Sequence, residues 1–184
     1  LTIDIGRRFD LEAGSLKSLD GFENILLDCS RNGRPCVLRL SHSSKRCRSQ
    51  VESELHWVDY LAGHGVSVCR PIRSEAGRLT EQVDASDGSF TAVLFERAPG
   101  GPVKRADWTE AMTRNRGRLL GRIHALTKHY QPAPGREKRP VWFEENDFAH
   151  YRRYLLPDDT VIGERFEELQ TELRAIPHDP DSFG

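Results

Sequence analysis

The chain has 184 residues, of which 37% are hydrophobic and 30% are charged, and its formal net charge is −1. This length allows one domain or two small lobes that share a cleft, and the composition is typical of a folded globular protein. The near-neutral charge does not favour nucleic acid as a partner, and no apolar run approaches the roughly 20 residues of a membrane span. The first residues do not resemble a signal peptide. We therefore expect a cytoplasmic protein with no nucleic-acid and no membrane partner, and the sequence does not indicate an oligomeric state.

The four cysteines do not predict a metal site. They are Cys29, Cys36, Cys47 and Cys69, and no two of them form a C-x-x-C pair, so the sequence argues against zinc. Cys29 and Cys36 flank a predicted turn symmetrically, so a disulfide between them is sterically conceivable. Because no secretion signal is visible, we expect reduced thiols.

Two short turns predict β-hairpins in the first hundred residues. Asn32-Gly33 separates two apolar segments, and this dipeptide suits a two-residue turn because both central positions need a positive φ. In that register Ser30 faces Pro35 in a non-hydrogen-bonded pair, so the missing N–H of proline costs no ladder bond. Asp87-Gly88 predicts a second hairpin, between residues 79–85 and 89–96.

A helix is predicted between the hairpins. Ser49 and Glu52 have the S-x-x-E spacing of a capping box, which marks a helix start. One apolar stripe follows at helical spacing, made of Val51, Leu55, Val58, Leu61 and Ala62. Gly63 and Gly65 are expected to end the helix.

After residues 98–102, a Pro/Gly cluster, the pattern changes to helices alone. A helix framed at its start by Asp107 and Glu110 is expected to bury one apolar face, formed by Met112, Leu119, Leu120, Ile123 and Leu126. Two shorter helices are expected before Pro157 and Pro177, the first carrying Phe148 and Tyr151. Antiparallel strands around one helix, followed by helices only, indicate an α+β fold. We divide the chain into a strand-rich lobe (1–97), a connector (98–102) and the start of a helical lobe (103–184).

Arg39 and Glu54 are the charged residues whose positions call for an explanation. Arg39 interrupts an apolar strand and shares a face with Val37, whereas Leu38 and Leu40 take the other face. Glu54 lies at the edge of the apolar stripe of its helix, where a carboxylate is partly desolvated and needs a cation. The two side chains satisfy each other if the helix packs beside the strand. The alternative is that both are solvated surface charges.

Two further segments could approach a ligand through their backbones. The turn that contains Gly21 and Asn24 could bring backbone N–H groups to phosphates, although an ordinary hairpin turn explains it as well. Residues 93–100 run from an apolar strand into the connector, where exposed backbone groups could pair with a flat heterocycle. The alternative for this segment is a plain linker.

Together these motifs resemble the aminoglycoside phosphotransferase and type II homoserine kinase group, which has a protein-kinase-like fold. The resemblance covers roughly residues 15–130 and rests on the order and spacing of several loose motifs. They are Gly21-x-x-Asn24, Val37-Leu38-Arg39, Glu54 with Gly65-Val66-Ser67-Val68 after it, the connector of residues 94–100, and Leu120-Gly121-Arg122-Ile123-His124.

The resemblance implies an ATP- or GTP-dependent phosphotransferase that uses Mg²⁺ and acts on a hydroxyl group of a small metabolite or of an aminoglycoside-like acceptor. In that family a basic residue at the position of Arg39 contacts the α- and β-phosphates, and it is usually lysine. Arginine keeps the charge but is bulkier and grips phosphate as a fork. The resemblance also implies nucleotide-binding roles for further residues. Glu54 orients Arg39, and Val37 covers the purine. The Glu96 C=O and the Ala98 N–H pair with the purine edge, and the loop from Gly21 to Asn24 covers the phosphates.

The catalytic pattern of the family, H-G-D-x-x-x-x-N followed by D-x-D, does not occur in this chain. His178-Asp179-Pro180-Asp181 lacks the asparagine and contains a helix-breaking proline. We therefore predict no catalytic and no metal-binding residue in this chain, and we expect it to be truncated before the catalytic loop and inactive alone. The function hypothesis is a small-molecule kinase; the alternative is a non-catalytic nucleotide-binding or assembly module of the same fold.

Overall fold

The computed structural model describes residues 2–19, 21–101, 103–136 and 150–177. The chain forms two compact units, residues 1–137 and 138–184, and each unit is described by itself. In the part of the chain that the structure describes, no helix combines the length and the apolar character needed to cross a membrane.

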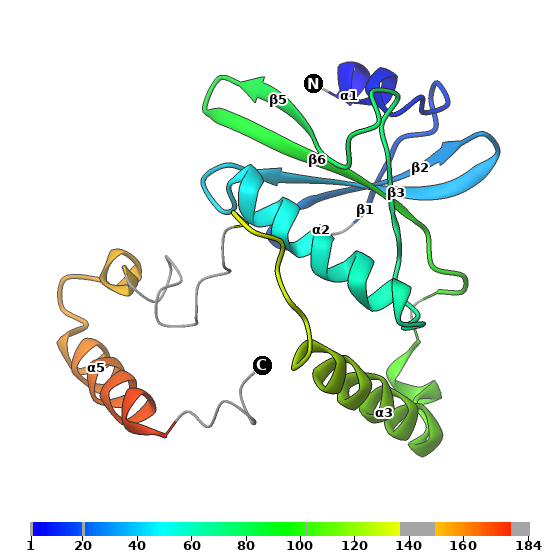
Figure 1. Ribbon diagram of the computed structural model, residues 1–184. Helices are drawn as coiled ribbons and strands as arrows, with labels where there is room; N and C mark the ends of the chain where they lie inside the picture. Colours follow the sequence, from blue (N-terminus) through cyan, green and yellow to red (C-terminus); the bar gives the residue numbers. More distant parts are fainter. Residues whose placement is uncertain (1, 20, 102, 137–149, 178–184) are drawn as a thin grey trace. The chain divides into compact units, whose positions relative to one another are not determined.

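An antiparallel sheet of six strands forms the centre of the first unit (Figure 1). Its strand order is β1-β2-β3-β6-β4, and β5 also pairs with β6. The strands are β1 (Lys17–Leu19), β2 (Ile25–Arg31), β3 (Arg34–His42), β4 (Pro71–Ile72), β5 (Glu81–Ala85) and β6 (Gly88–Glu96). In β3, residues of alternating position are buried, so the strand has a core face with Cys36, Leu38 and Leu40 and a half-exposed face with Val37 and Arg39.

The first predicted hairpin is confirmed. Asn32 and Gly33 have φ values of 51° and 71°, and Ser30 lies opposite Pro35 as expected. The same register places Cys29 opposite Cys36, and both are buried free thiols.

The second hairpin is confirmed, but its predicted turn residues are wrong by one position. Ala85 pairs with Gly88, so the two-residue turn is Ser86-Asp87 and Gly88 begins β6. The glycine serves close packing, because a Cβ at Gly88, where φ is 146°, would lie 2.8 Å from the Ser43 Oγ.

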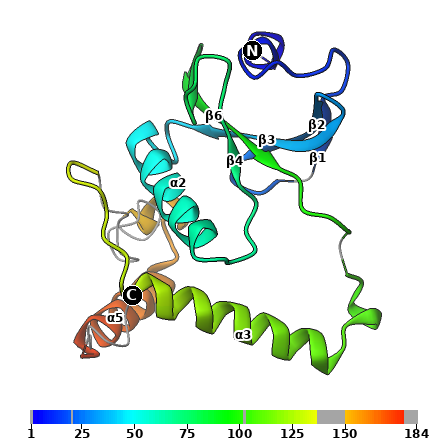
Figure 2. The ribbon, with the colours of Figure 1, turned by 45° about the vertical axis from the view of Figure 1, so that its right-hand side comes forward.

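Helices α1 (Thr2–Arg8) and α2 (Arg48–Gly63) cover opposite faces of the sheet, as Figures 1 and 2 both show. After α1, which the sequence did not predict, Phe9 is fully buried and joins Ile5 in one hydrophobic cluster with the core residues of β2, β3 and β6. Val51 and Leu55 of α2 pack against Val93 on the other face. Burial of these two apolar faces is what holds both helices on the sheet.

The start of α2 differs from the prediction, and its end agrees with it. Cys47 is the N-cap, and its N–H donates to the Gln50 Oε1 over 3.2 Å, so the capping box expected from Ser49 and Glu52 is wrong. Glu52 is instead engaged by Thr80 and Arg48. At the other end Gly65 has a φ of 73°, and two backbone bonds, Gly65 N–H to Ala62 O and Val66 N–H to Leu61 O, form a Schellman motif.

Helix α3 (Glu110–Thr127) follows a 3₁₀ turn (Arg105–Asp107), and Thr109 caps it by accepting from the Met112 N–H. The expected burial of its apolar stripe is wrong for the described residues, because no residue of α3 is buried and Leu120 is 46% exposed. Helical periodicity identifies an apolar face but not what covers it. Polar bonds join α3 to α2: the Trp57 indole N–H donates to the Thr127 Oγ1 and the Tyr60 hydroxyl to the Leu126 carbonyl, each over 3.0 Å.

Two short helical segments of the second unit lie where the sequence predicts short helices. The first is a 3₁₀ turn (Tyr151–Tyr154) and the second is α5 (Thr160–Ala175), which ends before Pro177. The Tyr151 hydroxyl donates to the Glu167 Oε1 over 2.7 Å, and this bond connects the turn to the helix. Phe148, which was expected in the first of these helices, lies outside the described residues.

Candidate functional site

The structure brings Arg39 and Glu54 together. The Arg39 Nη1 donates to the Glu54 Oε1 over 2.7 Å, and the two side chains are 17% and 32% exposed. The strand presents Arg39 toward α2 because Leu38 and Leu40 occupy the core face. This contact excludes the alternative that both residues are solvated surface charges.

Arg39 also has two nitrogens without a partner. Its Nε and Nη2 atoms are buried, and neither makes a hydrogen bond to any residue that the structure describes. These two atoms form one edge of the guanidinium group, which matches the spacing of two oxygens in a carboxylate or phosphate. A buried donor without an acceptor costs about 1–3 kcal/mol, so this edge requires an anionic or polar group that these residues do not supply.

The guanidinium group of Arg39 lies over an aromatic ring. The Arg39 Cζ lies 5.1 Å from the centroid of the Phe95 ring, which is within the range of a cation–π interaction. Phe95 packs in turn against the buried cluster of Val51, Leu55 and Val93. Packing therefore holds the Phe95 ring in place next to Arg39.

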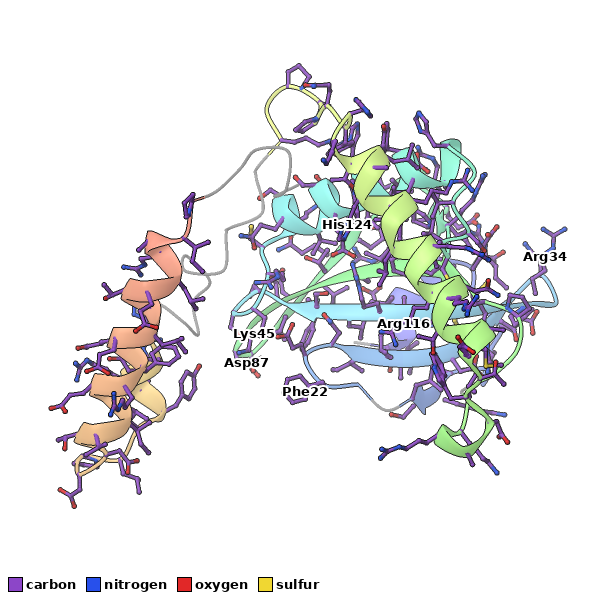
Figure 3. The ribbon with its side chains drawn as sticks, turned by 90° about the horizontal axis from the view of Figure 1, so that it is seen from below. Phe22, Arg34, Lys45, Asp87, Arg116 and His124 are labelled. Carbon is purple, nitrogen blue, oxygen red and sulfur yellow. The ribbon has the colours of Figure 1, made fainter. Side chains whose placement is uncertain are left out.

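The loop with Gly21 and Asn24 connects β1 to β2 and is attached to the Arg39 face of β3. The Ser41 hydroxyl donates to the Asn24 Oδ1 over 2.6 Å, and Ser41 is two residues from Arg39 on the same strand. A Cβ at Gly21 would lie 2.2 Å from the Asn24 carbonyl oxygen, so the turn requires glycine. Phe22 between them is fully exposed, and Figure 3 shows it at the end of the sheet opposite to Arg34.

The connector begins at the end of β6, where Glu96 and Ala98 are exposed. The Glu96 N–H donates to the Arg70 carbonyl over 2.9 Å, and the Arg97 N–H donates to the Pro35 carbonyl over 3.3 Å. These bonds fix the backbone of residues 96 and 97 at the end of β6, which lies between β3 and β4 in the sheet. Val37 lies directly opposite Phe95 in the β3–β6 ladder, so it is close to this end of β6 as well.

A second group of polar side chains fastens the start of α2 to the strand-rich part of the unit. Glu52 is partly buried, which by itself raises the pKa of its carboxyl, but hydrogen bonds from Thr80 and Arg48 outweigh burial and hold that pKa below its ordinary value. The two bonds are each 2.8 Å long. The bond from Thr80 joins α2 to the segment before β5, and the bond from Arg48 lies within α2.

No group of three or more His, Cys, Asp or Glu residues in the described ranges is arranged to hold a metal ion. The segment His178-Asp179-Pro180-Asp181, which we set aside as a connector, lies outside the described residues.

Sequence reasoning missed two residues of the site, Phe95 and Ser41. Both belong to strands that were predicted, but their contacts depend on how β3 pairs with β6 and on how the β1–β2 loop folds back. The alternation of β3 could have indicated Ser41, because residues 37, 39 and 41 share one face.

Comparison with known proteins identifies the family. The sequence profile of the phosphotransferase enzyme family matches residues 19–183. The chain belongs to this family. It is 32% identical to amicoumacin kinase of Bacillus subtilis (strain 168) over 178 residues, which are 96% of this chain and 53% of that protein.

Similar solved structures confirm the predicted protein-kinase-like α+β fold. The chain matches amicoumacin kinase in complex with AMP-PNP, Ca²⁺ and Ami with a TM-score of 0.88 and 28% identity, over 97% of this chain and 54% of the other. It matches a microcompartment-associated aminopropanol kinase with a TM-score of 0.74 and 19% identity, over 97% of this chain and 59% of the other. The second similarity shows the fold alone. The chain spans about half the length of the relatives that it matches, and these relatives are small-molecule kinases.

Proposed function

We propose that the full-length phosphotransferase moves the γ-phosphate of ATP or GTP to a hydroxyl group of a small metabolite or of an aminoglycoside-like molecule. The observation that carries this proposal is the Arg39–Glu54 pair, in which Glu54 accepts a hydrogen bond from Arg39 Nη1 while the buried Nε and Nη2 atoms have no hydrogen-bond partner among the described residues. A nucleotide phosphate supplies the acceptors that this edge requires.

Phosphoryl transfer depends mainly on positioning and on neutralising charge, and the residues of this chain suit that task. In the proposal Arg39 contacts the α- and β-phosphates and Glu54 keeps its orientation. The loop from Gly21 to Asn24 covers the phosphates, and its attachment to Ser41 keeps it on the Arg39 face. Val37 covers the base, and the base edge pairs with the Glu96 carbonyl and the Ala98 N–H, which are parts of the exposed connector.

A divalent metal, Mg²⁺ in our proposal, neutralises phosphate charge during transfer when it is bound. The related amicoumacin kinase structure contains AMP-PNP and Ca²⁺, which supports a nucleotide and a divalent ion as ligands here. The described residues of this chain offer no acidic cluster for the metal. In the proposal the metal is held by the nucleotide phosphates and by residues of the full-length protein outside this segment. The aspartate that orients the acceptor also lies outside this segment.

Substitution of Arg39 tests nucleotide binding. Titration calorimetry of the full-length protein with AMP-PNP and Mg²⁺ should show about 10- to 100-fold weaker binding for Arg39→Ala, which removes charge-assisted hydrogen bonds. Arg31→Ala is the matched control, because the Arg31 side chain is also 17% exposed and pairs with one glutamate, Glu75. Equal affinity of Arg39→Ala and wild type would remove the basis of the proposal.

A phosphorylation screen tests transfer. The full-length protein should consume ATP or GTP with at least one acceptor among amino acids, amino alcohols, sugars and aminoglycosides, whereas the 184-residue segment alone should not. Nucleotide binding without transfer to any acceptor would instead support the alternative, a non-catalytic binding or assembly module of the same fold.

A further inference from the structure

The aromatic ring beneath Arg39 sits where its orientation cannot easily change. Phe95 lies diagonally across from Arg39 on the same face of the sheet, since Arg39 pairs with Val93 and Phe95 pairs with Val37. Its ring is half-buried and packs against Val51, Leu55 and Val93, all of which are at most 2% exposed. A ring held in this way presents a fixed surface to the guanidinium group.

The contacts of Arg39 together define one orientation of its plane. Glu54 binds the Nη1 end over 2.7 Å, and the Phe95 ring lies 5.1 Å from the Cζ. The Nε–Nη2 edge is the part that remains without a hydrogen-bond partner among the described residues. Glu54 alone would allow the group to rotate about its single hydrogen bond, because one bond does not fix a plane.

The geometry points to Phe95 as a positioning residue, which orients the Arg39 guanidinium so that its Nε–Nη2 edge receives a phosphate as a two-point fork. This inference rests on the proposed nucleotide-binding function of Arg39. It also explains why arginine suits position 39. A lysine ammonium can also lie over an aromatic ring, but it is a point charge with no plane and no fork for the ring to orient.

The inference predicts energetic coupling between positions 39 and 95. In the protein with Phe95, Arg39→Lys should weaken AMP-PNP binding about tenfold, because an oriented fork is replaced by a point charge. In a Phe95→Leu background no ring orients the guanidinium group, so Arg39→Lys should weaken AMP-PNP binding only about twofold. The difference of about fivefold is the size expected for a partly buried cation–π contact.

Two matched variants separate the ring from general packing. Phe95→Tyr retains the aromatic face and should restore the tenfold cost of Arg39→Lys. Phe90→Leu removes a half-buried phenylalanine of the same strand, whose ring lies 4.9 Å from His42, and should leave the tenfold cost unchanged. If Phe95→Leu does not fold, Phe95→Met fills a similar volume without a ring and takes its place.

The experiment is titration calorimetry of the full-length protein with AMP-PNP and Mg²⁺, repeated with adenosine. Adenosine has no phosphates, so Arg39→Lys should not change its affinity in any background. The role of Phe95 is overturned if Arg39→Lys lowers AMP-PNP affinity by the same factor with phenylalanine and with leucine at position 95. That result would leave the proposed function in place. If instead neither Arg39→Lys nor Arg39→Ala changes AMP-PNP binding, the nucleotide-binding function of Arg39 fails, and the role of Phe95 fails with it.

Discussion

The substitution Glu54→Gln isolates the charge of the carboxylate that holds Arg39. Glutamine has nearly the same size and keeps an oxygen acceptor, so the change removes charge and little else. Glu54 makes one 2.7 Å bond to Arg39, and a hydrogen bond to a charged group is worth about 1.5–3 kcal/mol. Because 32% of the Glu54 side chain is exposed, water partly replaces the lost attraction, and we expect a net effect of about 1 kcal/mol.

That loss should appear in ligand affinity if Glu54 orients Arg39. We expect Glu54→Gln to weaken AMP-PNP binding by about fivefold, measured by titration calorimetry on the full-length protein. The melting temperature, measured by differential scanning calorimetry, should fall only slightly.

Glu52→Gln provides the control on the same helix. Glu52 has a similar exposure, 37%, and its bonds go to Arg48 and Thr80 rather than to Arg39. We expect this variant to lower the melting temperature without changing AMP-PNP affinity. The reasoning is refuted if Glu54→Gln binds AMP-PNP as tightly as wild type, or if Glu52→Gln weakens binding as much.

Three further predictions concern stability and chemical reactivity. Burial raises the pKa of Glu81, but hydrogen bonds from Arg78 and Ser74 outweigh burial and hold that pKa below the ordinary 4.5. The ionised carboxylate therefore stabilises the fold above pH 4.5, and this stabilisation is lost as the pH falls through the lowered pKa. Glu81→Gln should make the free energy of unfolding, measured by urea unfolding, depend less on pH in the acid range. Gly65→Ala should destabilise the protein by about 1 kcal/mol because φ is 73° there, whereas Gly63→Ala, at a position with open space and no positive φ, should not, as thermal unfolding would show. Burial raises the pKa of the Cys29 thiol to about 12. In the native protein, iodoacetamide at pH 8 should therefore modify the exposed Cys69 far faster than Cys29, as measured by peptide mass spectrometry. Equal modification rates would contradict the burial of Cys29.

Much of the local structure could be predicted from the sequence. The Asn32-Gly33 turn, the apolar stripe of α2 and the glycine at its end are set by backbone preferences that act within a few residues. The predictions failed where a competing arrangement took the predicted place. Cys47 and Gln50 form the capping box, so α2 begins before Ser49, and Glu52 is engaged by Thr80 instead. Gly88 pairs with Ala85 in the β5–β6 ladder, so it belongs to a strand and not to the turn.

In the candidate site, too, local sequence determined some features and tertiary packing decided others. The alternation of β3 by itself determined that Arg39 stands on the half-exposed face with Val37, because side-chain direction along a strand is a property of the local backbone. Only the tertiary structure decided that Glu54 and Phe95 meet it there, since these contacts require α2 to pack on that face and β6 to pair with β3 in one register. Long-range register is a result of packing, and it leaves no local pattern in the chain.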